Sequence, residues 1–175
     1  MPRPIDSLSV FLSHALAIEH EAAERYAEFA ASFAERGEPA LAGICNELAR
    51  AEAEHYARLL RAAEGVELAS LRPGEYRWIE AGVPETPSRD VFYRIATPAQ
   101  LLQVALEAEK RARRFFAWVA RTTRDRTVRL MAREIATEEA QHVTWIEQAI
   151  AYRDPARVAE PPLAGGMAPK DAVTG

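Results

Sequence analysis

The sequence predicts an all-α protein, an antiparallel four-helix bundle with a long crossover between its second and third helices. Its prolines leave three long proline-free tracts, at 5–38, 40–72 and 99–154. A proline inside a helix costs about 3 kcal/mol, so tracts of this length, rich in Ala, Glu, Arg and Leu, are helix candidates. The last tract is long enough for two helices, which gives two helical hairpins in total.

The first hairpin is expected to contain helices over about 7–35 and 39–64. A proline at 39 suits the first turn of the second helix, because its missing N–H would have no partner there. Residues typical of helix ends flank the two segments, as N-cap candidates or as closing glycines: Asp6, Ser7, Gly37 and Gly65.

The second hairpin is expected over about 98–121 and 127–152, with a short break at 122–126. Residues 97–100, Thr-Pro-Ala-Gln, form a capping box with proline at the first helical position. The stretch from 66 to 96 is long for a connection inside a compact domain. A crossover along the length of a bundle accounts for it.

One four-helix domain is therefore expected over 1–153, followed by a Pro-, Gly- and Ala-rich tail at 154–175 that we expect to be disordered. The formal net charge of −4 argues against a nucleic-acid partner. The longest apolar run, 115–120, is too short to cross a membrane, and no signal peptide is evident. Cys45 stands alone, which excludes an internal disulfide or a cysteine cage. These features predict a cytoplasmic protein.

An internal repeat carries the candidate chemistry. Superposing 16–31 on 106–121, and 45–56 on 132–143, aligns one Glu in the first helix of each hairpin and a Glu-x-x-His motif in the second. The six aligned residues are Glu19, Glu52, His55, Glu109, Glu139 and His142. Glu and His three residues apart share a helix face, so each motif can present two ligands to one point.

A single Glu-x-x-His motif is more often a solvated ion pair than a metal site. The repetition of the whole set instead favours four carboxylates and two imidazoles that meet in the bundle core. Such mixed oxygen and nitrogen ligation suits iron, with manganese as the alternative. Burying four carboxylates would be prohibitive without cations, so two divalent metals are expected.

The motifs resemble the ferritin-like di-iron carboxylate superfamily, in particular rubrerythrins and bacterioferritins, over about residues 7–153. Residues 17–26, with a Tyr seven residues after Glu19, resemble the first helix of both families. Glu109-Lys110, followed by an aromatic residue, resembles the third helix of rubrerythrins, and 138–147 resembles the fourth helix of bacterioferritin.

The resemblance implies Glu52 and Glu139 as metal-bridging carboxylates, Glu19 and Glu109 as terminal ones, and one His per metal. The sequence departs from the families at several places. It has no rubredoxin-type cysteine pairs, which implies an external electron donor. It has Ala53 where bacterioferritin has a haem-binding Met.

Further departures concern the neighbours of the ligands. Ala112 stands where rubrerythrins have an extra Glu. Ala51 and Glu138 stand where many members place an Asp that orients a ligand histidine. Glu107 is a rival to Glu109 on the same helix, although it does not fit the repeat.

The resemblance implies a non-haem di-iron oxidoreductase in which two Fe(II) react with hydrogen peroxide or oxygen, by rubrerythrin-like peroxide reduction or ferroxidase activity. It also implies a homo-oligomer, expected to be a dimer. Two alternatives stay open: a di-iron oxygenase that hydroxylates an organic substrate, and a non-catalytic metal-binding or storage protein.

Tyr26 is expected either to donate a hydrogen bond to a ligating carboxylate or to be an ordinary core aromatic. Tyr56 and Trp145 follow the two ligand histidines and are expected to wall the site. His14 and His20 are expected at the surface or at an interface, and a solvated face is expected to hold the arginines 111, 113 and 114.

Overall fold

The computed structural model describes residues 2–78 and 83–152, and every regular element within these ranges is helical. The elements are α1 (Leu8–Glu35), α2 (Pro39–Ala62), η1 (Pro73–Glu75), α3 (Arg89–Phe92), α4 (Pro98–Thr122) and α5 (Arg126–Tyr152). The four long helices begin and end within two residues of the expected positions, and the tail at 154–175 lies outside the described residues. No described helix combines the length and apolarity needed to cross a membrane.

The expected end signals act much as the sequence indicates. Ser7 caps α1 by accepting a hydrogen bond from the Val10 N–H, and Thr97 caps α4 by accepting one from Gln100. Gly37 and Gly65 both adopt positive φ, 71° and 78°, which favours glycine at a helix end. Asp6 differs from expectation, because its carboxylate accepts the Arg124 N–H at 2.6 Å in the turn between α4 and α5.

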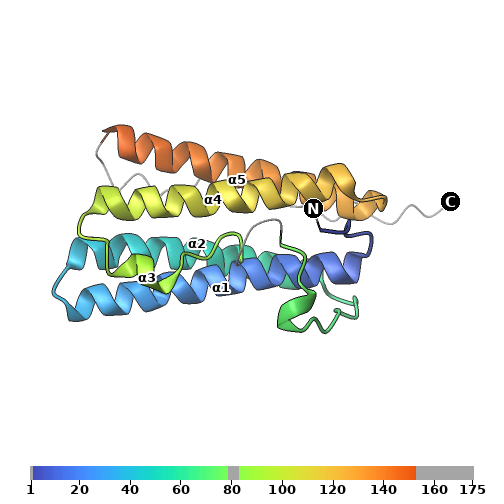
Figure 1. The fold of residues 1–175 in the computed structure, drawn as a ribbon, viewed down its shortest axis with the longest axis horizontal. Coiled ribbons are helices and arrows are strands. Elements are labelled where there is room, and N and C mark those ends of the chain that lie inside the picture. The colour runs from blue at the N-terminus through green and yellow to red at the C-terminus, as the bar shows by residue number, and fades with distance from the viewer. Residues whose placement is uncertain (1, 79–82, 153–175) are drawn as a thin grey trace.

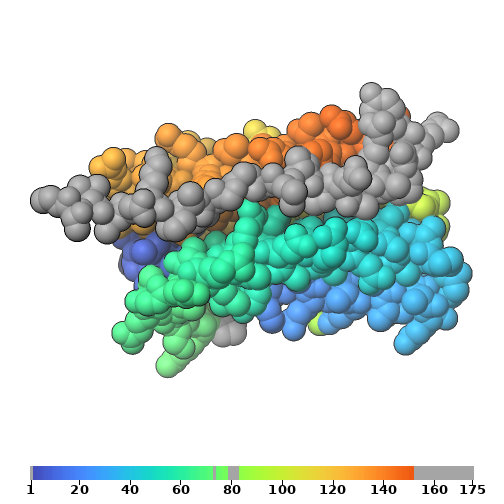
Figure 2. Space-filling model, turned by 180° about the vertical axis from the view of Figure 1, so that it is seen from behind, coloured from blue at the N-terminus to red at the C-terminus, as the bar shows by residue number. Residues whose placement is uncertain are grey.

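The bundle consists of two helical hairpins, with α1 packed along α2 and α4 packed along α5. In Figure 1 the crossover passes in front of α1 and α4, while α2 and α5 lie behind them. Figure 2, seen from the opposite side, shows α2 and α5 on the near face. This arrangement confirms the predicted all-α, ferritin-like bundle.

The crossover follows α1 from its first turns to its last. Ser13 donates to the Ala69 carbonyl at 2.9 Å near the start of α1. Near its end, Arg89 forms a bidentate ion pair with Glu28, and the Phe92 ring packs on Phe33 with centroids 4.7 Å apart. The chain therefore returns to the end of the bundle where α4 begins.

His14 is buried, and our expectation that it lies at the surface is wrong. Its Nδ1–H donates to the Val10 carbonyl at 2.7 Å, while its Nε2 accepts the Arg77 N–H at 2.9 Å. The rings of Tyr76 and Trp78 both pack edge-on against it at 5.1 Å. The aromatic residues of the crossover therefore cover α1 at this point.

The apolar core is divided into two clusters by a polar layer. One cluster includes Leu48 and Val143, and the other includes Leu59 and Ile135. On each long helix, one buried Glu lies between residues of the two clusters. Leu48 and Leu59 flank Glu52 in this way on α2, and Ile135 and Val143 flank Glu139 on α5. The four carboxylates therefore lie in the middle of the bundle.

Replacing His14 with Leu should reduce the free energy of unfolding by about 1–3 kcal/mol at pH 7.5, because the partly buried Arg77 N–H loses its acceptor. Burial lowers the pKa of His14 below 6.5, so the wild-type contribution is complete above pH 6.5 and declines as the pH falls. Urea unfolding of both proteins should therefore show a smaller difference at pH 5.5. An equal or larger difference there would contradict the neutral, doubly hydrogen-bonded His14.

Candidate metal centre

All six predicted ligand side chains lie together in the polar layer. α1 contributes Glu19, α2 contributes Glu52 and His55, α4 contributes Glu109, and α5 contributes Glu139 and His142. Each of the four Glu residues is at most 1% exposed. Helical periodicity explains the convergence, because each Glu occupies a core-facing position between apolar residues.

The two halves of the site have nearly the same geometry. Nδ1 of His55 lies 3.5 Å from a carboxylate oxygen of Glu19 and 3.4 Å from one of Glu52. Nδ1 of His142 lies 3.3 Å from Glu109 and 3.4 Å from Glu139. The internal sequence repeat therefore corresponds to a repeated set of contacts.

The two histidines meet where the halves join. Their rings stack with centroids 4.7 Å apart and planes 11° from parallel. Two groups of potential ligand atoms, each within 4.8 Å of one another, contain a histidine: Glu19 with Glu52 and His55, and His55 with Glu139 and His142. Both histidines come from α2 and α5, the helices on the near face of Figure 2.

Burial and neighbouring charges shift the pKa values of the carboxyl groups in the site. Burial, reinforced by the negative charge of Glu109, raises the pKa of Glu52 to about 7 in spite of its contact with His55. Burial also raises the pKa of Glu139 well above its usual range. Contacts with His142 outweigh burial at Glu109 and lower its pKa.

Both histidines show the complementary shift. Burial lowers the pKa of each imidazole, but the adjacent carboxylates outweigh it and raise both pKa values well above 6.5. Two charged imidazoles thus offset part of the negative charge of the carboxylates. Bound cations would displace those protons and take over this role.

The residues fit a pair of divalent cations. Several buried carboxylate oxygens form no full hydrogen bond within the described residues. Oε2 of Glu19, of Glu52 and of Glu139 each have only a histidine Nδ1 at 3.4–3.5 Å, and Oε1 of Glu139 has no partner there. Buried oxygens without donors are costly, and cations that prefer carboxylate and imidazole ligands would satisfy them. This donor set suits iron or manganese.

Glu85, in the crossover, is a buried carboxylate that sequence reasoning missed. It is 0% exposed, and one of its oxygens lies within 4.8 Å of a carboxylate oxygen of Glu52 and of Glu109. It has no counterpart in the internal repeat and follows no helical register. The one feature of the sequence that could have indicated its burial is its position between Pro84 and Pro87, and this is a weak signal.

The structure separates Glu109 from its rival. Glu107 is exposed and forms an ion pair with Lys110 at 3.5 Å, whereas Glu109 lies in the buried cluster.

Tyr26 is also fully buried, and its hydroxyl has no partner within the described residues. Burial and the negative charges of Glu109 and Glu52 raise its pKa well above 10.

Of the residues expected to wall the site, Trp145 stacks on His142 with centroids 5.1 Å apart. Tyr56 instead packs against the exposed His20 at 5.1 Å. Our expectation that Arg111 belongs to a solvated face is wrong, because it is half-buried and its Nε donates to the Pro84 carbonyl at 2.8 Å.

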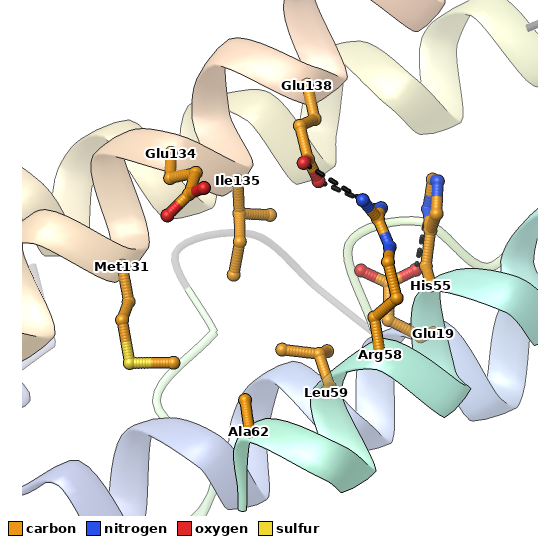
Figure 3. A pocket seen from close by; sticks show the side chains of 9 residues that line it. All are labelled: Glu19, His55, Arg58, Leu59, Ala62, Met131, Glu134, Ile135 and Glu138. Atoms are coloured by element: carbon orange, nitrogen blue, oxygen red, sulfur yellow. Dashed lines mark hydrogen bonds and ion pairs between the residues drawn. The ribbon is translucent and has the colours of Figure 1, made fainter. Parts of the chain in front are cut away.

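A small cavity of about 40 Å³ reaches the site between α2 and α5. Figure 3 shows Glu19 and His55 at one end of it and Met131 with Ala62 at the other. Beside Glu19, Arg58 and Glu138 join the two helices by hydrogen bonds of 3.1 and 3.0 Å. Glu138 therefore pairs with Arg58, where an Asp at this position would be expected to orient a histidine.

The fold and the buried cluster define a ferritin-like carboxylate bundle. Residues 11–84 match the model of the rubrerythrin family. An uncharacterized conserved protein from Magnetospirillum magnetotacticum MS-1, of known crystal structure, is 29% identical with a TM-score of 0.65, covering 83% of this chain and 95% of its own. Comparison with curated proteins gave no match. The chain thus has a ferritin-like fold, and its residues 11–84 are similar to the rubrerythrin family.

Replacing Glu52 or Glu139 with Ala should abolish stable binding of two metals, because each substitution removes a carboxylate from the centre of the cluster. Metal content after anaerobic loading with Fe(II), measured by elemental analysis, would fall below two per chain in each variant. Two tightly bound irons in either variant would contradict the assignment.

Glu109 and Glu107 form a matched pair on α4. Glu109→Ala should weaken iron binding at least about tenfold, as expected for loss of a group that binds the metal or orients a ligand. Glu107→Ala should change it less than about twofold, because its carboxylate is at the surface. The reverse order in anaerobic calorimetry would transfer the ligand role to Glu107.

Proposed function

We propose that this protein is a non-haem di-iron oxidoreductase that reduces a small oxidant, hydrogen peroxide in preference to oxygen. The proposal rests first on the buried cluster of four Glu and two His. The observation that favours a small oxidant over an organic substrate is the size of the cavities beside that cluster.

Two cavities are lined by the proposed ligands. One, of about 40 Å³, is lined by Glu19 and His55, and the other, of about 30 Å³, by Glu52, Glu109 and His142. Volumes of this size hold one or a few water-sized molecules. Peroxide and oxygen meet that limit, whereas most organic substrates do not.

A larger groove of about 610 Å³ lies between the crossover and α4. Its lining includes Arg94, Gln103 and Arg111, but none of the six proposed ligands. An organic molecule in this groove would remain outside the buried cluster. The geometry therefore favours a small oxidant over hydroxylation of an organic substrate.

In this proposal Glu52 and Glu139 would be shared by the two metals, Glu19 and Glu109 would each bind one metal, and His55 and His142 would each provide one imidazole. Two bound Fe(II) would supply the two electrons that, with two protons, convert one hydrogen peroxide into two waters. The carboxylates hold compensating negative charge in place before the reaction, which avoids reorganising a solvent. Trp145 packs against His142 and limits its movement.

A separate electron donor completes the proposed cycle, because the sequence has a single cysteine and so cannot form a four-cysteine iron site. Cys45 is buried in the core, where burial raises the pKa of its thiol to about 12. It is therefore not suited to act as a thiolate donor at neutral pH. The proposal further includes a homodimer in the cytoplasm, as the resemblance implies.

Ferroxidase activity is the second candidate. The small cavity beside Glu19 and His55 also has Glu134 and Glu138 in its lining, so carboxylates lead from the surface toward the cluster. Such a path suits the entry of a divalent cation. In that function iron is the substrate and oxygen or peroxide the oxidant.

The function is tested by loading the protein anaerobically with Fe(II) and mixing it with peroxide or oxygen in a stopped-flow spectrometer. We expect saturation at two irons per chain and oxidation at least about tenfold faster with equimolar peroxide, seen as oxo-bridged ferric absorption. Faster oxidation by oxygen would shift the assignment to ferroxidase or oxygenase chemistry. Tight binding without oxidation would leave a metal-storage protein.

A further inference from the structure

The crossover places one more carboxylate against the proposed metal centre. Glu85 is 0% exposed, and neither of its oxygens has a hydrogen-bond partner within the described residues. It lies on a connecting segment, where a side chain could readily point to solvent. A buried carboxyl group without a charged partner is costly whether it ionises or takes up a proton, so its inward position needs a physical reason.

The carboxylate of Glu85 lies beside those of Glu52 and Glu109. Its ligand atom groups with those of Glu52 and Glu109, all within 4.8 Å of one another. Within the described residues, no such group contains both Glu85 and a histidine. The crossover lies over α1 and α4 in Figure 1, whereas both histidines come from α2 and α5.

Two arginines hold this segment on the bundle. Arg111 of α4 donates to the Pro84 carbonyl at 2.8 Å, and Arg25 of α1 donates to the Pro87 carbonyl. Both prolines are buried, and their fixed φ angles limit the backbone on either side of Glu85. The side chain is therefore held inward by contacts to both neighbouring helices.

Among the residues that the structure describes, no charged donor contacts this carboxylate. Its strongest electrostatic neighbours are the carboxylates Glu52, Glu139, Glu19 and Glu109, and they act with burial to raise its pKa well above its usual range. A neutral side chain of similar size would be less costly at this position. The position becomes favourable once cations lie between these oxygens.

We propose that Glu85 is an additional metal-ligating carboxylate, which binds from the crossover on the side of the centre formed by Glu52 and Glu109. The inference rests on the proposed di-metal function and extends its ligand set beyond the six repeated residues. It also lies outside the residues that match the rubrerythrin family, since that match ends at residue 84. The crossover thereby joins the two hairpins through the metal as well as through the chain.

The test compares the wild type with Glu85→Gln and Glu107→Gln by anaerobic Co(II) titration. Co(II) replaces Fe(II) because its visible absorption reports the number of ligands and strengthens as that number falls. Glu107 is a matched control, because it is an acid near the same segment with its carboxylate at the surface. Glu85→Ala is titrated in parallel, so that loss of the carboxylate is tested without an introduced amide.

We expect two Co(II) per chain in the wild type and in Glu107→Gln, with indistinguishable spectra. Both Glu85 variants should bind one of the two Co(II) at least about tenfold more weakly and absorb more strongly when loaded. The thermal stabilisation on adding Co(II) should also be smaller in these variants, since it follows the affinity. Circular dichroism of the metal-free proteins checks that all remain folded.

Wild-type affinities and spectra in the folded Glu85 variants would overturn this inference while leaving the di-metal function intact. Failure of the wild type to bind Co(II) or Fe(II) would instead overturn both. An equal loss in Glu107→Gln would show a general charge effect and would likewise overturn a ligand role for Glu85.

Discussion

The burial of four carboxylates in the middle of an apolar bundle is the constraint on which the rest of this structure depends. Glu19, Glu52, Glu109 and Glu139 together divide the core into two apolar clusters. A layer of this kind is costly unless positive charge compensates it. His55 and His142 supply part of that charge, and divalent cations would supply the rest. Metal binding and stability of the core are therefore linked, because the groups that destabilise the empty bundle are those that would hold the metal.

The internal sequence repeat makes the two halves of the candidate metal centre nearly symmetric. The residues around the ligands and the crossover make the two halves differ. Each half places its histidine against two carboxylates at similar distances, 3.3 to 3.5 Å. The neighbours differ: Tyr26 has a buried hydroxyl where its repeat partner, Phe116, has none. The crossover covers one side of the bundle and brings Glu85 to it, while small cavities reach the ligands elsewhere. Such asymmetry suits a centre that admits a small oxidant from a limited direction.

Most of the fold follows from local signals in the sequence. Proline-free tracts, caps and glycines predict the long helices, because their determinants lie within a few residues of each helix end. The repeat predicts which Glu and His share a layer, since helical spacing fixes the face that each occupies. Glu85 and His14 could not be placed in this way. Both depend on how the irregular crossover lies on α1 and α4, through contacts such as Arg111 with the Pro84 carbonyl and Arg77 with His14.

The central claim is that this carboxylate layer holds two metals. Anomalous diffraction from crystals grown with Mn(II), collected at the manganese absorption edge, tests it most directly. We predict two peaks per chain between Glu52 and Glu139, roughly 3.5–4 Å apart as in other two-metal sites. The absence of peaks in the layer, or peaks confined to surface carboxylates such as Glu107 and Glu134, would contradict the account.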